Sequence, residues 1–140
     1  MAPSDAVPLR RGAVGVVRRE ERFLVIRRAQ GISAPGAFCF PGGGIEPGES
    51  EEAALVRELQ EELGILVTPR QRLWRSVTRW GVELYWWQAD LSPNATLAPN
   101  PAEVESVHWL SPEEMLALDE LLSSNREFLH AVHSGEIVLA

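Results

Sequence analysis

Two short apolar runs near the start of the chain are separated by charged residues. Residues 12–17, GAVGVV, and residues 23–26, FLVI, flank the polar segment RREER. Apolar runs of this length between polar turn residues are typical of buried strands. We therefore expect the two runs to form a hairpin with a buried centre.

A helix is predicted over residues 50–63. Ser50 is a favourable N-cap, and Glu51 and Glu52 place negative charge at the positive end of the helix dipole. Gly64 is the residue type that commonly ends a helix. The apolar positions share one arc of the helix surface, at about 100° per residue; they are Leu55, Val56, Leu59 and Leu63. This arc is the expected packing face.

A long hairpin is predicted after the helix. Residues 66–80 and 82–91 have the pattern of strands, and Gly81 between them indicates the turn. The second run alternates between two sets of side chains, Val82, Leu84 and Trp86 in one and Glu83, Tyr85 and Trp87 in the other. Because alternate residues of a strand point to opposite faces, only one set can face a given cavity.

The remainder of the chain contains one further strand and two helices. Residues 92–101, rich in Pro and Asn, indicate a loop, and residues 104–110 indicate a strand. The Ser-Pro pair at 111–112 indicates the start of a helix, and a last helix is expected after Asn125. Residues 136–140 suggest a short edge strand. Helices thus alternate with strand pairs, which predicts an α/β fold with a mixed sheet between helices.

Length and composition predict one globular domain. The 140 residues fit a single domain over 1–140, and 45% hydrophobic with 24% charged residues is ordinary for a globular protein. No apolar stretch is long enough to span a bilayer, and the start MAPSDAVPLRR lacks the apolar run of a signal peptide. The single cysteine, Cys39, has no partner for an internal disulfide. We therefore expect a cytoplasmic protein with no membrane partner.

The charge balance narrows the choice of partners. A net charge of −7 opposes binding to a nucleic-acid polymer, because such binding depends on clustered Lys and Arg. Seven Glu lie between Glu46 and Glu62, which makes this stretch a natural place for divalent cations. All thirteen basic residues are Arg, so a Lys nucleophile or Schiff base is excluded.

The predicted helix concentrates three carboxylates beside its apolar arc. Glu58, Glu61 and Glu62 lie on one side of the helix, where like charges repel and raise their carboxyl pKa values unless a cation sits among them. Hard oxygen ligands on a rigid element suit Mg²⁺. A solvated acidic helix face is the alternative. That alternative leaves the Pro-Gly-Gly-Gly entrance at 41–44, the isolated Glu49 and Arg57 unexplained.

The segment from Gly43 to Ile65 resembles the Nudix box. Its residues match the pattern Gly-x5-Glu-x7-Arg-Glu-aliphatic-x-Glu-Glu-x-Gly-aliphatic at every defining position. The resemblance implies the Nudix hydrolase family and its α/β/α sandwich. It also implies hydrolysis of a nucleoside diphosphate linked to another group X, with water attacking phosphorus and Mg²⁺, or Mn²⁺ in its place, bridging enzyme and pyrophosphate.

The resemblance also assigns roles within the box. Glu58, Glu61 and Glu62 correspond to metal ligands, and the Gly42 carbonyl matches a backbone ligand of several members. Arg57 would orient the catalytic loop and the carboxylates. The general base varies within the family, and we expect Glu61 in this role, with Glu49 and a later glutamate as rivals.

Many members supply one further acid just before the strand that follows the long loop. Glu103, six residues ahead of Trp109, occupies the matching place, and Glu105 is the competing candidate. An exposed carboxylate at a strand edge is the plain alternative for either residue.

Substrate contacts are expected outside the box. Asn125 resembles the asparagine that helps to hold a purine in the MutT-type branch, although it could equally be a helix N-cap. Aromatic residues that could stack on a base or pack in the core are Trp74, Trp80, Tyr85, Trp86 and Trp87. Phe38 or Phe40 is expected to line the pocket, and Arg27 or Arg28 to reach a phosphate.

Marks of other branches are missing from the sequence. Trp80 stands where ADP-ribose hydrolases have a proline, and the SQPWPFPxS array of NADH hydrolases is absent. The expectation is therefore a MutT-like enzyme that converts a nucleoside triphosphate, with an intact or oxidised base, to the monophosphate and pyrophosphate. Hydrolysis of ADP-ribose, a sugar nucleotide or a dinucleoside polyphosphate is the alternative within the family. A non-catalytic nucleotide-binding module is another, though such modules usually lose box carboxylates. A monomer and a homodimer are both compatible with the sequence.

Overall fold

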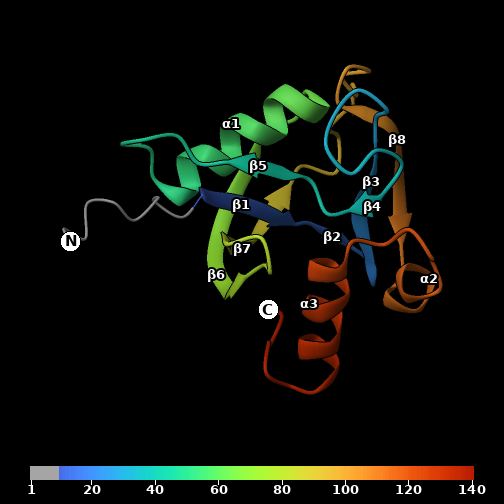
Figure 1. Cartoon of the computed structure of the whole chain (residues 1–140). Coiled ribbons are helices and arrows are strands. Elements are labelled where there is room, and N and C mark those ends of the chain that lie inside the picture. Colours follow the sequence, from blue (N-terminus) through green and yellow to red (C-terminus); the bar gives the residue numbers. More distant parts are fainter. Residues whose placement is uncertain (1–9) are drawn as a thin grey trace.

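The computed structural model describes residues 10–140 (Figure 1). Within them the elements are β1 Arg10–Val16, β2 Arg18–Arg19, β3 Arg22–Arg28, β4 Phe38–Cys39, β5 Gly42–Gly44, α1 Glu51–Leu63, β6 Val67–Val77, β7 Val82–Leu91, β8 Val104–Leu110, α2 Pro112–Leu116 and α3 Ser123–His133. Most of the signal-peptide expectation concerns residues 1–9 and lies outside the described residues.

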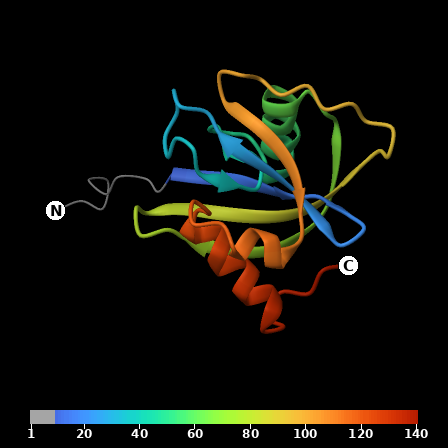
Figure 2. The same ribbon diagram turned by 90° about the vertical axis from the view of Figure 1, so that its right-hand side faces the viewer.

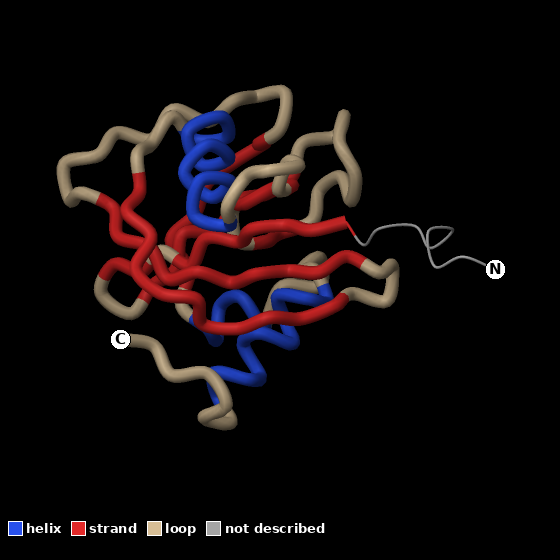
Figure 3. Tube along the Cα trace, turned by 90° about the vertical axis from the view of Figure 1, so that its left-hand side faces the viewer, coloured by secondary structure: helices blue, strands red, loops and turns tan. Residues whose placement is uncertain are grey.

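The strands form two sheets that lie between the helices. One sheet has the order β5-β1-β7-β6. In the other sheet β3 pairs with β2, β4 and β8. β1 and β7 run parallel, whereas β6 and β7 and also β3 and β8 are antiparallel. Figure 2 shows α1 on one side of the strands and α2 and α3 on the other. Figure 3 shows the same layers from the opposite side. The expected α/β fold with a mixed sheet between helices is confirmed.

Each layer of helix covers its own hydrophobic core. On one side Leu55 and Leu59 of α1 pack in a cluster that includes Leu24 of β3, and on the other side Phe128 of α3 packs in a cluster with Phe23 and Val25. Neighbouring residues of β3 therefore enter opposite cores. A strand buried on both faces needs apolar side chains throughout, which is why FLVI is uninterrupted.

Helix α1 begins and ends as its sequence predicts. The Ser50 hydroxyl accepts a hydrogen bond from the Ala53 amide, and Gly64 adopts the left-handed conformation with φ 64° while its amide donates to the Gln60 carbonyl. Gly15 of β1 allows the helix to approach, because a Cβ at this position would lie 3.1 Å from side-chain atoms of both Leu55 and Leu59.

The expected N-terminal hairpin is wrong in its pairing. β1 pairs with β5 and β7, and of the segment before β3 only the two-residue β2 pairs with β3. The chain thus crosses from one sheet to the other near Val17. Both apolar runs are buried on two faces, and this pattern carries no information on which strand lies beside which.

The C-terminal region differs from expectation in two places. Helix α3 begins at Ser123, so Asn125 lies in its first turn and is not the N-cap. Residues 136–140 form no strand, and the Ala140 backbone instead exchanges hydrogen bonds with the Gln88 side chain. The helix at 112 is confirmed, with a complete capping box between Ser111 and Glu114.

Candidate active site

Arg57 joins the glycine-rich entrance to helix α1. Its Nε and Nη2 atoms each donate to one oxygen of Glu49 at 2.8 Å, and Nη2 also donates to the Gly44 carbonyl at 2.9 Å. Nη1 donates to Glu58 at 3.0 Å and to Glu61 at 3.3 Å. The guanidinium group therefore holds the 44–49 loop against the helix and orients two of its carboxylates.

The Arg57 pairing sets the charge of Glu49. Hydrogen bonds from Arg57, assisted by the Glu46 backbone, lower the pKa of Glu49 from 4.5 to about 2. The same pairing with Glu49 raises the pKa of Arg57. Both groups are thus fully charged near neutral pH, and Glu49 has little tendency to accept a proton.

Glu62 is a buried carboxylate at the centre of the site. It is only 5% exposed and accepts a hydrogen bond of 2.9 Å from the Gly42 amide. Burial, with added repulsion from Glu58 and Glu103, raises its pKa from 4.5 to about 8. Burial likewise raises the pKa of Glu58, and again Glu103 contributes. These three carboxylates therefore act on one another electrostatically.

Glu103 and Glu105 have different surroundings. The Oε2 atom of Glu103 is buried and has no hydrogen-bond partner among residues 10–140. The Oε2 atom of Glu105 lies 3.4 Å from the Arg27 Nε, and its Oε1 atom lies 3.5 Å from the side-chain Nε2 of Gln30. The negative charge of Glu105 is thus already balanced by Arg27. Glu103 is therefore the carboxylate with unused ligand capacity beside the box.

The glycines of β5 bring the backbone against these acids. A Cβ at Gly43 would overlap the Glu58 carboxylate, and one at Gly42 would overlap the Ala13 carbonyl. Both positions consequently require glycine. This close approach also explains how the Gly42 amide can reach Glu62.

The donor chemistry of the site fits a hard divalent cation. In the part of the chain that the structure describes, no three His, Cys, Asp or Glu side chains converge closely enough to hold one metal ion. Glu58 and Glu61 are instead turned to Arg57. However, Glu58, Glu62 and Glu103 are hard oxygen donors that repel one another, and the buried Oε2 of Glu103 lacks a partner. A cation among them would relieve both costs.

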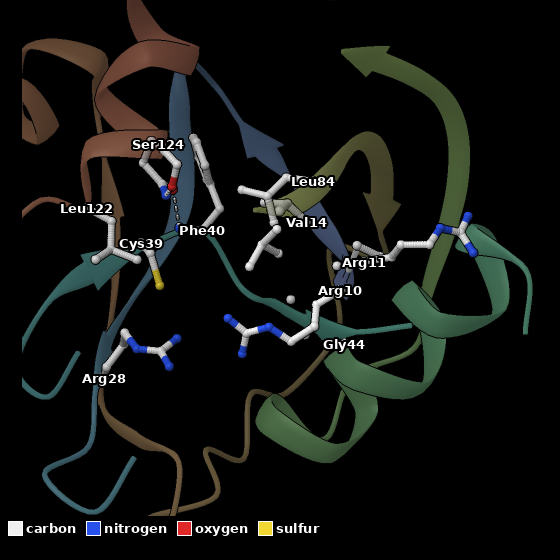
Figure 4. Close-up of a pocket in the computed structure, with 16 residues that line it drawn as sticks. Arg10, Arg11, Val14, Arg28, Cys39, Phe40, Gly44, Leu84, Leu122 and Ser124 are labelled. Carbon is white, nitrogen blue, oxygen red and sulfur yellow. Dashed lines mark hydrogen bonds between the residues drawn. The ribbon is translucent and has the colours of Figure 1, made fainter. Parts of the chain in front are cut away.

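A cavity of about 260 Å³ opens beside this cluster (Figure 4). Four residues expected in the site line it, namely Arg28, Phe40, Gly42 and Asn125. Asn125 is 4% exposed, and its Oδ1 accepts a hydrogen bond of 2.8 Å from the Phe40 amide. Its Nδ2 donates to the Ser124 hydroxyl at 3.2 Å. Asn125 thus fixes the first turn of α3 against the β4–β5 connection at Phe40, which lines the cavity.

Three other expected contacts lie away from this cavity. The Trp87 indole donates to Glu51 at the start of α1, and the guanidinium group of Arg72 lies 4.9 Å from the Tyr85 ring centroid. Arg27 pairs with Glu105 and its guanidinium lies over the Phe38 ring. All three residues have partners within the protein that account for their positions.

The cavity also contains residues that sequence reasoning missed. They are chiefly Arg10, Leu84, Leu122 and Ser124. The alternation along β7 separates Leu84 from Tyr85, but it gives no sign of which set faces the cavity. Leu122 and Ser124 become recognisable only when the start of α3 is known, and we find no sequence signal for Arg10.

The comparison with known families decides the identity of this site. A sequence model of the NUDIX domain matches residues 8–132. The chain belongs to the Nudix family. Members of this family use divalent metal ions, in agreement with the donor set around Glu62.

Relatives and solved structures agree with this membership. The CTP pyrophosphohydrolase of Escherichia coli K12 is 34% identical over 104 residues, covering 72% of this chain and 75% of the relative. The 8-oxo-dGTP diphosphatase of the same organism is 52% identical over 54 residues, or 38% of this chain and 42% of the relative. The crystal structure of a MutT protein from Methanosarcina mazei Go1 has a TM-score of 0.78 at 23% identity, covering 92% of this chain and 96% of its own. The last match confirms the fold.

The protein is a Nudix hydrolase that acts on pyrophosphate bonds of nucleotides. The segment 43–65 is its Nudix box, as the sequence indicates. Among residues 10–140, no helix is long and apolar enough to cross a membrane.

Proposed function

We propose that this Nudix hydrolase converts nucleoside triphosphates to the monophosphate and pyrophosphate with Mg²⁺, for which Mn²⁺ can substitute. The observation that carries the proposal is the position of the cavity. It extends from Phe40 and Asn125 to the glycines of β5, which touch Glu58 and Glu62. A nucleoside in the cavity would point its phosphates at the carboxylates. The names of the two relatives, a CTP pyrophosphohydrolase and an 8-oxo-dGTP diphosphatase, favour a triphosphate.

The proposed metal ligands are Glu58, Glu61, Glu62, Glu103 and the Gly42 carbonyl. Glu103 is preferred to Glu105 because its buried oxygen has no partner within residues 10–140, whereas Glu105 pairs with Arg27. When bound, the divalent ion supplies charge neutralisation for the phosphates and lowers the pKa of the attacking water. Arg57 keeps the carboxylates in position through its hydrogen bonds to Glu58 and Glu61.

Glu61 is the proposed general base. Its side chain is 52% exposed and makes only long contacts with Arg57, so it is the box carboxylate best able to reach a water molecule. Glu49 has a pKa of about 2 while it is paired with Arg57, which makes it a weak base. Glu62 is buried and already accepts the Gly42 amide.

Arg28 and Asn125 are the proposed substrate contacts. Arg28 lines the cavity, and its charge offsets part of the rise in the pKa of Glu62. Arg28 therefore lies where a phosphate approaches the carboxylates. The Oδ1 of Asn125 is taken by the Phe40 amide, which leaves an Nδ2 hydrogen as the group it can offer to a base. Asn125 would therefore bind an acceptor atom of the base, such as the guanine O6 carbonyl oxygen.

Three wider expectations stay predictions. They are a single domain over residues 1–140, a cytoplasmic location, and free nucleotides as the partner with no nucleic-acid polymer. A monomer and a homodimer both remain compatible with the proposal.

The test is release of pyrophosphate from a panel of ribo- and deoxynucleoside triphosphates with Mg²⁺, at neutral and alkaline pH. Pyrophosphate, and not orthophosphate, is the expected product, because the proposal places cleavage between the α and β phosphates. ADP-ribose, a sugar nucleotide and a dinucleoside polyphosphate, whose cleavage releases no pyrophosphate, are assayed in parallel by the nucleotide that each forms. Faster turnover of one of these would assign the enzyme to another substrate class, and no turnover of any compound would favour a binding module.

A further inference from the structure

A second, larger cavity lies next to the proposed substrate cavity. This outer cavity has a volume of about 540 Å³. It shares part of its wall with the inner one, through Arg10, Arg28, Val82, Leu84, Leu122 and Ser124. Its remaining wall comes mainly from the β6–β7 turn, with Arg79 and Trp80, and from Ser33 in the β3–β4 loop. The two cavities therefore adjoin each other.

The inner cavity alone is small for a nucleotide. Its volume of about 260 Å³ lies below the range of about 300–1,000 Å³ that is usual for ligand sites. The outer cavity shares Leu122 and Ser124, next to Asn125, with the inner one and meets it also at Arg10 and Arg28, whereas Gly42–Gly44 line only the inner cavity. Among the described residues that line the outer cavity there is no carboxylate of the Nudix box. A group in the outer cavity would consequently extend the nucleoside end of the substrate and not the phosphate chain under cleavage.

The outer cavity is positively charged in an acidic protein. Arg10, Arg28 and Arg79 line it against one acid, Glu127. Within residues 10–140, none of the three arginines forms an ion pair with a carboxylate. Figure 4 shows the guanidinium groups of Arg10 and Arg28 pointing toward each other across the space between them. Like charges that face one another in a protein of net charge −7 indicate a site for an anion.

Arg28 is held in this position by the neighbouring loop. Its Nε donates to the Ser33 carbonyl at 2.7 Å, and its Nη2 donates to the Ser33 hydroxyl at 2.8 Å. These bonds orient the guanidinium group, and both acceptors are uncharged oxygens of Ser33. The arginine is thus preorganised for a phosphoryl group.

Trp80 adds an aromatic surface to the outer cavity. It is 73% exposed, although tryptophan side chains are highly buried on average. The Arg79 guanidinium lies 4.8 Å from its ring centroid, which is a cation–π contact. An exposed indole beside an arginine matches the combination that binds a base and its phosphate.

We propose that the outer cavity binds a phosphoryl group esterified to the ribose of the substrate, and that Trp80 stacks on a second base when that phosphoryl group links a further nucleotide. The proposal rests on the proposed function, since it assumes that the nucleoside occupies the inner cavity. It makes Arg10 and Arg79 determinants of specificity for ribose-phosphorylated nucleotides.

The test is calorimetric binding with Mg²⁺ of three compounds that lack a cleavable pyrophosphate. They share one base and are a nucleoside 5′-monophosphate, the 3′,5′-bisphosphate, and the 5′-phosphorylated dinucleotide. The bisphosphate is expected to bind at least about tenfold more tightly than the monophosphate, and Arg79→Gln is expected to remove most of this gain. The dinucleotide should bind more tightly again, and Trp80→Ala should remove only that second gain while Trp80→Phe retains it.

The control is Arg70→Gln, which removes an exposed arginine that pairs with Asp90 outside both cavities. It should leave all three affinities unchanged. Equal affinities of the wild type for the monophosphate and the bisphosphate, or a gain that survives Arg79→Gln, would overturn the proposal. A bisphosphate gain without a dinucleotide gain would exclude the stacking role of Trp80. Because binding is measured without turnover, these outcomes are independent of the pyrophosphate assay that tests the proposed function.

Discussion

Arg57 binds both carboxylate oxygens of Glu49, eight residues earlier in the chain, at 2.8 Å each. This paired geometry fixes the 44–49 loop to the middle of α1. The remaining guanidinium hydrogens reach Glu58, Glu61 and the Gly44 carbonyl. One side chain therefore positions the loop and two of the proposed metal ligands together.

Arg57→Lys is expected to lower kcat by about 10–100-fold, the usual effect of losing a residue that orients metal ligands. A lysine keeps the positive charge but cannot bind both oxygens of Glu49 at once. The measurement is steady-state kinetics with a Mg²⁺ titration, in which the apparent metal affinity should fall as well. Arg70→Lys, which alters the exposed pair with Asp90, is the matched control. Unchanged metal affinity in Arg57→Lys would show that the arginine does not position the ligands.

Glu62→Gln is expected to stabilise the protein in EDTA and to abolish its activity. The raised pKa of about 8 means that Glu62 in the folded protein keeps a proton that it loses above pH 4.5 in the unfolded chain. The contribution of Glu62 to the free energy of unfolding is therefore complete below pH 4.5 and is lost as the pH rises toward about 8. Glutamine avoids this loss and can still accept the Gly42 amide.

The Tm of Glu62→Gln should accordingly exceed that of the wild type by several degrees near neutral pH, and the difference should close in mildly acidic buffer. Thermal unfolding in EDTA across this pH range measures the difference. Glu52→Gln, an exposed position on the same helix, should show no such pH-dependent gain. A lower Tm for Glu62→Gln at neutral pH would contradict the raised pKa.

Glu103→Gln is expected to weaken metal binding, whereas Glu105→Gln is not. In the described part of the chain the buried Oε2 of Glu103 has no hydrogen-bond partner, and the Glu103 charge acts on Glu58 and Glu62, while Glu105 pairs with Arg27. Removing a ligand carboxylate should raise the Kd for Mn²⁺ by about tenfold or more, because affinity depends on the number of ligand charges. Titration calorimetry of both variants gives a direct comparison. Equal affinities would remove Glu103 from the proposed ligand set.

Asn125→Ala is expected to reduce discrimination between bases. It also leaves the buried Phe40 amide without its acceptor, at a cost of about 1–3 kcal/mol in the free energy of unfolding. The ratio of kcat/KM values among the four bases is the appropriate measurement, because it does not depend on the fraction of folded protein. Ser124→Ala removes the hydroxyl that accepts from Asn125 and should change the ratio less. An unaltered ratio in Asn125→Ala would mean that this residue only braces the cavity wall.

Local sequence was sufficient wherever neighbouring residues make the relevant contacts. Ser50 and Gly64 bound α1 through hydrogen bonds within a few residues, and the Arg57 contact with Glu61 spans one helical turn. The spacing of box residues on a helix therefore predicts the side on which the carboxylates gather. The close approach of β5 to α1 is similarly reflected in the glycine at position 43.

Contacts between distant segments could not be predicted in this way. The Asn125 bond to the Phe40 amide joins residues 85 positions apart, and the parallel pairing of β1 with β7 crosses the whole Nudix box. Alternation along β7 showed that Leu84 and Tyr85 face opposite ways. Only the packing of α1 and α3 on the two faces places Leu84 at the cavity and Tyr85 among arginines.

The sequence by itself determined the family, the box and the helix that carries it, because these depend on residue identity at short spacing. The tertiary structure decided which sheet each apolar strand joins, which aromatic residues reach the cavity, and that Glu103 has an unpaired buried oxygen while Glu105 is paired. The physical reason is that a strand buried on both faces is apolar throughout, so its partners are chosen by long-range packing and not by its own pattern.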